Sequence, residues 1–545
     1  MQVSVPAAKR EGGLPYKWIV AGVVIFGIFM SILDGTIVNI AVPRLETAFG
    51  SDLNSVQWVL TAYTLAQGVA TPLTAFLADR IGTKRFYILS LAGFTLGSVL
   101  CGLSWSLPML ILFRIMQGVA GAFLSPLAIT LLYREFPPQE RGTVMGALGI
   151  PILLGPALGP TIGGYIVTYM DWQLIFYINL PIGILGVLLA FFFLHEGEIV
   201  PDKKFDIPGF LCSGIGLALL LYGLSDASTD GWTSPIVMGS LIVGIVLLIA
   251  FVLVELRLSR RGKQPLLDLT VFADRSFSTS SIASILVVFA LYGGLFLIPI
   301  YLQNLRGLSA YQAGLVLLPQ ALASMVAVLV GGRLVDRIGV RAVVIPGLII
   351  LAIAMWLYTS LNTSIPIGDF QWLLILRSFG IGLCLQPLSV SALSNIQPRR
   401  LSQASSVSTT IRFVGSSLAV AIIATLVQSQ NKVHYAHLAE QVTPTSSFGH
   451  LVMMIQAGLM GKGASAIAAY AYALKTIGGL LQLRSYMMAM QDAFRVSFFL
   501  AIVAIIATLF VTGNKKKAVV VDEASMSAEE RAEAEKAREE ASMAL

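Results

Sequence analysis

The sequence contains few charged side chains for its length. Charged residues occupy 12% of its 545 positions, whereas hydrophobic residues occupy 56%. Soluble globular domains usually carry about 25% charged residues. This composition therefore excludes an ordinary water-soluble protein and directs attention to the membrane.

Cysteine and histidine are also scarce. Cys101, Cys212 and Cys384 all fall within apolar segments, which predicts buried free thiols and excludes a disulfide framework. His434 and His437 stand in a polar segment without carboxylate or cysteine companions, so we predict solvated histidines and no metal site. No complete phosphate-binding P-loop string is present either. We therefore do not expect an enzyme, and we expect no cofactor.

The apolar residues are grouped into segments of about 18 to 27 residues, separated by short connections that carry charge, glycine or proline. A helix of such a length crosses the roughly 30 Å hydrocarbon core of a bilayer. The pattern predicts an all-α polytopic membrane protein with fourteen transmembrane helices. The expected helices are 17–43, 55–77, 86–104, 108–133, 141–167, 173–194, 208–225, 235–255, 277–304, 312–334, 341–361, 370–393, 404–429 and 493–513.

Lysine and arginine are distributed unevenly between alternate connections. Nearly all basic residues of the short connections fall on one side, and the other side carries only Arg44 and Arg306. Cytoplasmic loops are enriched in basic residues, so both termini are predicted to be cytoplasmic. The net charge of +7 then reflects the basic residues of the predicted cytoplasmic connections, and we expect no nucleic-acid partner. The expected location is the cell membrane, inner or plasma, among membrane lipids.

One carboxylate, Asp34, lies inside the first apolar segment. An acid at this depth costs about 2.5–3.5 kcal/mol on insertion scales and usually faces a bundle interior or a wet cavity. Asp34 is therefore a candidate proton site, and the alternative is a structural acid held by an arginine. Arg114 falls in the same outer half of the membrane by residue count. Because arginine stays protonated at any plausible pH, Asp34 is the member of this pair that can carry the proton.

The chain also contains an internal repeat. The string Asp-Arg-Ile-Gly at 79–82 recurs at 336–339, and Arg114 in the fourth expected helix has a counterpart, Arg377, in the twelfth. Secondary transporters are often built from repeated halves with a site between them. The predicted domains are a cytoplasmic N-terminus (1–16), a six-helix half (17–194), two inserted helices (195–276), a second six-helix half (277–513) and a charged cytoplasmic tail (514–545).

Five motifs together resemble one known family. They are residues 33–43 of the first helix, the loop 79–85, residues 114–121 of the fourth helix, residues 155–164 of the fifth and residues 176–183. Ala75, Thr83, Pro151 and Pro160 stand where the motifs usually have other residues. Over about residues 15–513 the chain resembles the 14-transmembrane-helix drug:proton antiporters (EmrB/QacA type) of the major facilitator superfamily.

The resemblance implies a proton-coupled exporter whose partners are a small-molecule substrate and protons, acting as a monomer with the proton gradient as its energy source. It links Arg114 to proton coupling, residues 155–160 to export, and the two Asp-Arg-Ile-Gly loops to closing one access state. The residues implied in conformational change are Asp79, Arg80, Gly82, Asp336, Arg337, Gly339, Gly155, Pro156, Gly159 and Pro160. A dedicated exporter of one endogenous molecule stays an alternative, and residues 155–156 argue against a proton-coupled importer.

The substrate is the least specified part of this hypothesis. Asp34 is the one acid expected deep in the membrane, against the arginines Arg114, Arg377 and Arg412, which disfavours dications. A roomy apolar cavity with few fixed polar groups suits amphipathic compounds. Packing or interhelical hydrogen bonds are the preferred explanation for the polar and aromatic residues among the candidate lining residues, which are Asp34, Tyr63, Gln67, Tyr292, Gln303, Gln320, Met325, Gln386 and Asn395.

Residues 431–492 are expected to form an outer loop much longer than the others. Its apolar patches, 451–460 and 464–474, are too short to span a bilayer and are separated by a glycine-containing break. Amphipathic helices resting on the outer membrane surface are the preferred interpretation. The tail after residue 517 is charged and rich in alanine, and we expect a solvated helix there.

Overall fold

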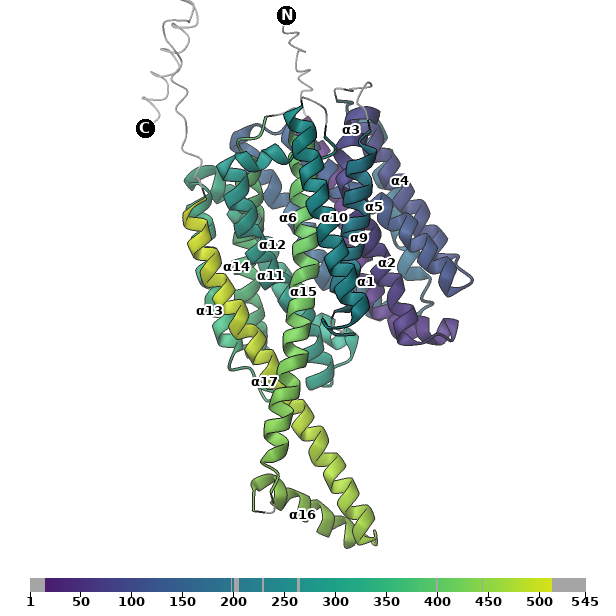
Figure 1. The fold of residues 1–545 in the computed structure, drawn as a ribbon, viewed down its shortest axis with the longest axis vertical. Helices are drawn as coiled ribbons and strands as arrows, with labels where there is room; N and C mark the ends of the chain where they lie inside the picture. The colour runs from purple at the N-terminus through teal and green to yellow at the C-terminus, as the bar shows by residue number, and fades with distance from the viewer. Residues whose placement is uncertain are drawn as a thin grey trace, which may run out of the picture. The chain divides into compact units, whose positions relative to one another are not determined.

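The structure is a computed structural model, and it describes residues 15–197, 199, 205–227, 230–261, 265–397, 400–443 and 445–511. The predicted tail, and all but the last two residues of the predicted cytoplasmic N-terminus, lie outside this part of the chain. Every regular element within it is a helix (Figure 1). The elements are α1 (Tyr16–Phe49), α2 (Leu53–Ala70), η1 (Thr71–Leu73), α3 (Thr74–Ile81), α4 (Thr83–Gly102), α5 (Leu107–Glu135), η2 (Pro138–Glu140), α6 (Arg141–Tyr169), α7 (Leu174–Tyr177), α8 (Asn179–Phe193), α9 (Ile207–Asp226), α10 (Pro235–Arg260), η3 (Leu269–Ala273), α11 (Arg275–Ile300), η4 (Tyr301–Leu305), α12 (Ala310–Ile338), α13 (Val340–Tyr358), α14 (Ile367–Leu393), α15 (Leu401–Glu440), α16 (Ser447–Met460) and α17 (Ala466–Leu509).

Thirteen helices within the described residues are long and apolar enough to cross a membrane. The predicted all-α membrane fold is therefore confirmed, although fourteen such helices were expected. The difference lies at the expected helix 55–77, which the structure divides into α2, η1 and α3. Pro72 lies at this division. The 3₁₀ turn Thr71–Leu73 interrupts the α-helix here, and Pro72 within this turn has no N–H to donate to an α-helical hydrogen bond.

Helices α6 and α12 pack closely together in the centre of the bundle. Glycines permit this approach, since a Cβ at Gly332 would collide with the carbonyl oxygen of Gly142. A Cβ at Gly146 would lie 2.8 Å from the carbonyl oxygen of Val328. Small residues that let two helix backbones approach are the usual means of helix association in membranes. This seam joins an element of the first predicted half to an element of the second.

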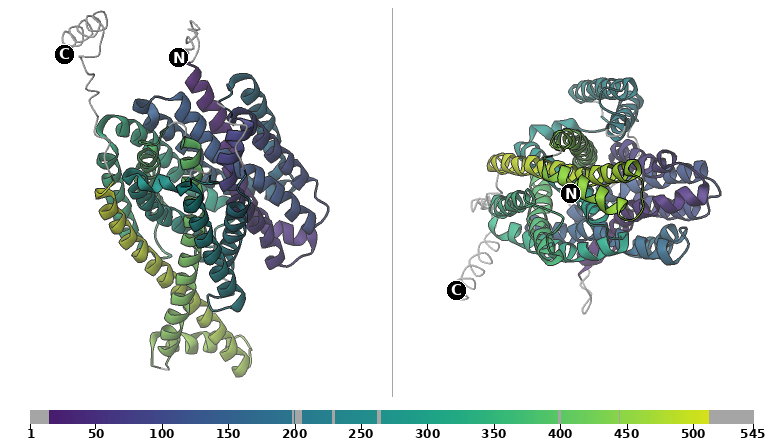
Figure 2. Two further views of the ribbon diagram at one scale, coloured as in Figure 1. Left: turned by 45° about the horizontal axis from the view of Figure 1, so that its top comes forward. Right: turned by 90° about the horizontal axis from the view of Figure 1, so that it is seen from below.

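Helices α9 and α10 pack mainly on each other and stand at the edge of the bundle (Figure 2). Trp58 of α2 stacks on Tyr222 of α9 with the ring centroids 5.9 Å apart. Trp232 Nε1, in the connection between the two helices, donates to Thr425 Oγ1 of α15 at 2.7 Å. The pair is thus attached to α2 and α15 from outside, while the domain boundaries themselves stay a prediction.

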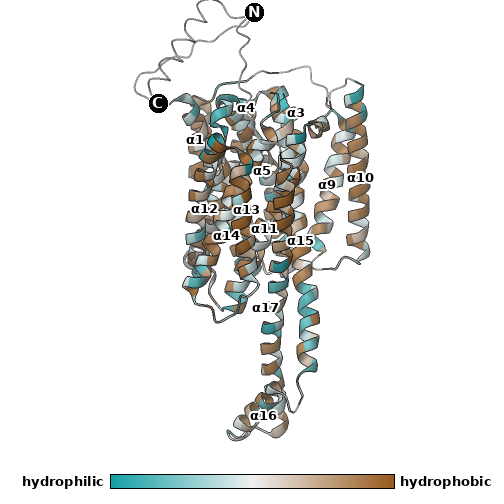
Figure 3. Ribbon diagram, turned by 90° about the vertical axis from the view of Figure 1, so that its left-hand side faces the viewer, coloured by the Kyte–Doolittle hydropathy of each residue, from teal (hydrophilic) through white to brown (hydrophobic). Residues whose placement is uncertain are grey.

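The segment 431–492 is largely continuous helix, which corrects the expected outer loop with helices resting on the membrane surface. α15 continues to Glu440 and α17 begins at Ala466, so both extend beyond the bundle and α16 connects their ends (Figure 1, Figure 3). No glycine or proline interrupts residues 416–440, so the helix propagates through its polar residues. The patch 464–474 is the start of α17, whereas the patch 451–460 lies in α16.

This helical hairpin has its own small apolar core. Leu438, Val452, Ile477 and Leu481 are buried there among neighbouring side chains of α15, α16 and α17. Where the hairpin leaves the bundle, His434 Nε2 lies 2.7 Å from Asp492 Oδ2. The expectation that His434 has no carboxylate companion was therefore wrong, because the partner is distant in sequence and is supplied by α17.

The orientation of the chain can be tested by accessibility. In a variant without Cys101, Cys212 and Cys384, a cysteine replacing exposed Ser447 of α16 should react with a membrane-impermeant maleimide in intact cells. A cysteine replacing Ile338, which is 57% exposed at the opposite end of the bundle, should react only after the membrane is opened. The reverse pattern would invert the predicted topology.

The α6–α12 seam predicts a second measurable effect. Gly332→Ala should lower the free energy of unfolding by about 1–3 kcal/mol, because the added methyl group has backbone against it and forces the helices apart. Gly331→Ala is the matched control, since the nearest atom to its Cβ would be the flexible end of Leu383 at 3.2 Å, and no backbone atom would lie nearer than 3.4 Å. Thermal unfolding in detergent compares the two. Equal melting temperatures would show that the seam tolerates separation.

Candidate functional site

Asp34 of α1 and Arg114 of α5 form an ion pair inside the helix bundle. Arg114 Nη1 donates to Asp34 Oδ2 at 2.6 Å, and neither side chain is exposed to solvent. Ions removed from water in this way are tolerated only when geometry is good and the remaining polar atoms are bonded. The two residues that the sequence grouped by their depth in the membrane are thus in direct contact.

Two amide side chains complete the surroundings of Asp34. Gln117 Nε2 donates to Asp34 Oδ1 at 3.0 Å, and Asn179 Nδ2 donates to the same oxygen at 2.8 Å. Arg114 Nη1 also donates to Gln117 Oε1 at 2.8 Å, so the four side chains form one network from α1, α5 and α8. Gln117 and Asn179 lie in the motifs 114–121 and 176–183, but they are not among the site residues predicted from the sequence. The signal was available for Gln117, because it follows Arg114 by three residues and shares its helix face.

An aromatic ring covers the guanidinium group of Arg114. The guanidinium carbon of Arg114 lies 3.9 Å from the ring centroid of Tyr63. Arg114 Nε donates to the carbonyl oxygen of Val59 at 3.3 Å. Tyr63 is in turn the acceptor of a 2.9 Å hydrogen bond from Gln67 Nε2. Tyr63 and Gln67, expected as substrate contacts, therefore support the Asp34 network.

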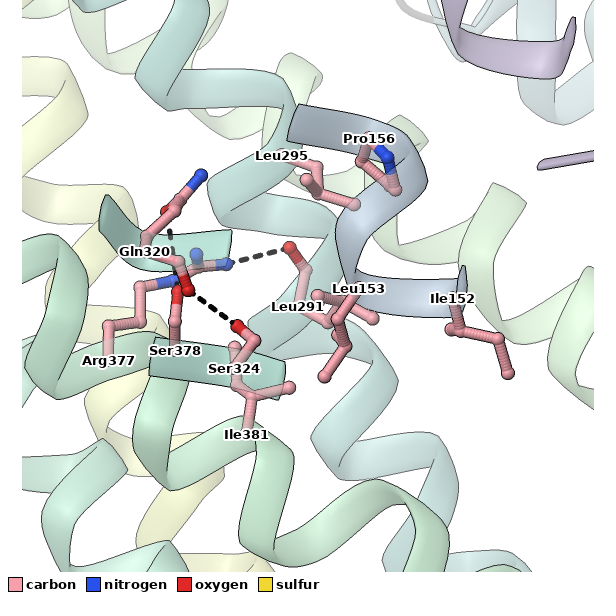
Figure 4. A pocket seen from close by; sticks show the side chains of 10 residues that line it. All are labelled: Ile152, Leu153, Pro156, Leu291, Leu295, Gln320, Ser324, Arg377, Ser378 and Ile381. Atoms are coloured by element: carbon pink, nitrogen blue, oxygen red, sulfur yellow. Dashed lines mark hydrogen bonds between the residues drawn. The ribbon is translucent and has the colours of Figure 1, made fainter. Parts of the chain in front are cut away.

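A separate cavity lies between α6, α11, α12 and α14 (Figure 4). In this conformation the cavity volume is about 20 Å³, enough for about one water molecule, and the cavity is partly open to solvent. Gln320 of α12 and Arg377 of α14 provide its polar wall, together with two serines. Ser378 Oγ donates to Gln320 Oε1 at 3.3 Å. Of the predicted lining residues, Gln320 alone lines this cavity, and Asp34 does not.

The other residues predicted to line the substrate cavity lie in different parts of the structure. Gln386 is fully enclosed in α14, and neither its amide nitrogen nor its amide oxygen has a partner within the described chain. Tyr292, Gln303 and Met325 are partly exposed on α11, η4 and α12. Asn395 lies exposed beyond the end of α14, where its Nδ2 is 3.5 Å from Asp274 Oδ2. The position of Asn395 corrects its expected place in a cavity lining, because α14 ends two residues earlier.

Arg412 is the third intramembrane arginine singled out by the sequence. It projects from α15 toward α14, where its Nη1 donates to Ser389 Oγ at 3.1 Å. It lies outside the set of residues that line the cavity of Gln320 and Arg377. The three arginines thus have different surroundings. Arg114 is paired with Asp34, Arg377 lines the cavity, and Arg412 connects α15 to α14.

Asp336, at the end of α12, binds the start of α6. Its Oδ1 accepts from the backbone N–H of Gly142 at 2.8 Å, and its Oδ2 accepts from the backbone N–H and the hydroxyl group of Thr143 at 2.8 and 2.7 Å. A carboxylate at a helix N-terminus satisfies otherwise unpaired N–H groups and interacts favourably with the helix dipole. This contact fastens the two predicted halves at one end of their seam.

The two repeated loops share a backbone geometry. Gly82 and Gly339 follow α3 and α12 with φ angles of 98° and 88°, a region that favours glycine. In the first copy, Arg80 lies over the ring of Phe76, with 5.9 Å to the ring centroid, and Asp79 is partly buried. In the second copy Arg337 is exposed, as Arg80 is in the first.

The glycine- and proline-containing part of α6 packs against α1. A Cβ at Gly155 would lie 2.6 Å from Ile32 Cγ2, and one at Gly159 would collide with the side chain of Thr36. Pro156 and Pro160 lie within the continuous helix α6. α6 therefore presents small residues to α1 on one side and to α12 on the other, and its contact with α1 lies within one turn of Asp34.

Among the described residues, no group of three or more histidine, cysteine or acidic side chains is gathered closely enough to hold a metal ion. Two cysteines, Cys101 and Cys384, are buried free thiols as expected, and Cys212 is partly exposed.

Comparison with known proteins agrees with this architecture. Residues 24–420 match the family model described as Major Facilitator Superfamily. The MFS-type transporter YhcA of Bacillus subtilis is 34% identical over 91% of this chain and 92% of its own length. The multidrug export protein EmrB of Escherichia coli is 31% identical over 76% and 81%, respectively. The human organic anion transporter MFSD10 has a similar fold, with a TM-score of 0.57 and 15% identity over 90% of this chain and all of its own. The chain belongs to the major facilitator superfamily of transporters.

Proposed function

We propose that this transporter is a proton-coupled exporter of amphipathic or lipophilic compounds, an antiporter used in multidrug efflux at the cell membrane. The observation that carries the proposal is the fully enclosed ion pair of Asp34 and Arg114. The similarity to EmrB, a multidrug export protein, supports the class of substrate. The resemblance of residues 155–160 to an exporter motif supports the direction of transport.

Asp34 is the proposed proton carrier. When ionised, it is held by Arg114, Gln117 and Asn179. Protonation removes the negative charge and leaves Arg114 enclosed without a counter-charge. Losing one partner of a buried pair costs about 3–5 kcal/mol, and this cost falls when helices separate enough for water to reach the cation. Protonation of Asp34 and water access to the cluster are therefore linked, and each favours the other.

Helix α6 is proposed to transmit this change. It touches α1 beside the Asp34 network through Gly155 and Gly159, and it touches α12 through Gly142 and Gly146. A displacement of α1 that accompanies protonation thus alters the packing of α6 on the second half. The contact of Asp336 with the start of α6 would hold the cytoplasmic end closed until that packing changes. Substrate leaves and protons enter when the halves rock between their two access states.

Replacing the carboxylate tests the proton role directly. Asp34→Asn keeps the size and shape of the side chain but cannot exchange a proton, so efflux driven by a pH gradient in proteoliposomes should fall to the level of empty vesicles. Asp369→Asn, at an exposed acid in the first turn of α14, is the matched control and should transport normally. Gradient-driven efflux by Asp34→Asn near the wild-type rate would assign Asp34 to a structural role.

A charge-conserving change tests the geometry of the pair. Arg114→Lys should reduce the efflux rate at least about tenfold, because one ammonium group cannot bind Asp34, Gln117 and the Val59 carbonyl simultaneously. The control is Arg495→Lys, which alters a solvent-exposed pair with Asp492 and should have little effect. If both lysine variants transport equally well, charge alone suffices at position 114.

A further inference from the structure

The sequence repeat relates Arg377 of α14 to Arg114 of α5, yet the two arginines have different partners. Arg114 faces Asp34, whereas α11, the helix against which Arg377 lies, contains no acidic residue. Gly294 occupies the facing position, where a Cβ would collide with the guanidinium group. α11 therefore makes room for Arg377 and supplies it with no counter-charge.

The hydrogen bonds of Arg377 leave its charge uncompensated. Its Nη2 donates to the carbonyl oxygens of Ala290 and Leu291 at 2.9 and 2.8 Å. Its Nε has no partner in the described part of the chain, although the side chain is only 2% exposed. Carbonyl oxygens carry partial charge only, so they offset part of the cost of enclosing a cation. A buried arginine of this kind remains a strong site for an anion.

Arg377 stands in the wall of the cavity between the two predicted halves. None of the ten lining residues is acidic, and Figure 4 shows Arg377, Gln320 and Ser378 grouped on one side. The opposite wall is apolar and is formed by α6 and α11 through residues such as Leu153 and Leu295. One buried cation beside an apolar wall is the arrangement that an amphipathic anion complements.

We propose that this cavity, widened when the two halves rock apart, binds the anionic head group of an amphipathic substrate, a carboxylate above all, with Arg377 as its ion-pair partner. The inference rests on the proposed export function and adds the charge of the substrate to it. The guanidinium N–H groups donate to the carboxylate oxygens, Gln320 and Ser378 lie beside the head group, and the hydrocarbon part contacts Leu153 and Leu295. Arg377 thus supplies the counter-charge for the substrate, as Asp34 supplies the counter-charge for Arg114.

Equilibrium binding to the purified full chain in detergent tests the proposal, with fluorescent dansyl-undecanoate and its uncharged methyl ester as probes. The wild type should bind the carboxylate at least about tenfold more tightly than the ester. Arg377→Gln should weaken carboxylate binding about 10- to 100-fold and leave ester binding within about threefold, as expected for the loss of a charge-assisted hydrogen bond. Arg377→Lys should retain part of the preference. Arg306→Gln is the matched control, since Arg306 also donates to a backbone carbonyl, that of Ile365, but lies outside the cavity.

Gly294→Ala is a second variant, useful if Arg377→Gln does not fold. It keeps the charge but displaces the guanidinium group, and it should also reduce the preference for the carboxylate. Equal loss of both probes in the Arg377 variants, an unchanged preference, or a preference that disappears in Arg412→Gln instead would overturn the proposal. So would a wild type that does not prefer the carboxylate. Binding needs no proton gradient, so these outcomes are separate from failure of gradient-driven efflux, which would contradict the proposed function alone.

Discussion

Charge enclosed away from water is costly, and the centre of this protein is organised around that cost. An isolated buried ion is destabilising by several kcal/mol, so each one needs an ionic partner or contact with water. A buried ion that is retained in a membrane helix therefore marks a functional site. For Asp34 the structure supplies a partner on every side: Arg114 and Gln117 from α5 and Asn179 from α8. The network is therefore also a tertiary contact that fixes α1 against two other helices. Altering the charge at its centre necessarily alters the packing of all three.

The residues of this site that the sequence could predict are the charged ones, because charged residues are rare in membrane helices. A single acid and a few arginines stand out against apolar helices, so Asp34, Arg114 and Arg377 were identifiable from the residues alone. Amides and tyrosines are common enough in membrane helices that their roles depend on rotation about the helix axis. For this reason the sequence could not show that Tyr63 covers Arg114 and binds Gln67, nor that Asn395 lies exposed beyond the end of α14.

The same reasoning explains which parts of the fold were predictable. Hydrophobic length located the membrane helices, because a bilayer imposes it. It could not show that Pro72 divides one of them, nor that α15 and α17 continue as helices through polar sequence. Polarity in residues 431–440 was interpreted as a loop, whereas a polar segment without glycine or proline extends a helix that has already formed. The hairpin core of Leu438 and Ile477 depends on contacts between residues distant in sequence.

The contrast between a paired Arg114 and an uncompensated Arg377 bears on the energetics of the transport cycle. If an anion leaves the cell while a proton enters, each exchange moves two positive charge equivalents inward. Every charge that crosses contributes about 2.3 kcal/mol per 100 mV of membrane potential. Such a cycle is electrogenic, so an inside-negative potential drives it even where the pH on the two sides is equal. Exchange of a proton for an uncharged compound moves one charge, so an anionic substrate, which the missing acid in α11 favours, would double the contribution of the electrical part of the proton-motive force.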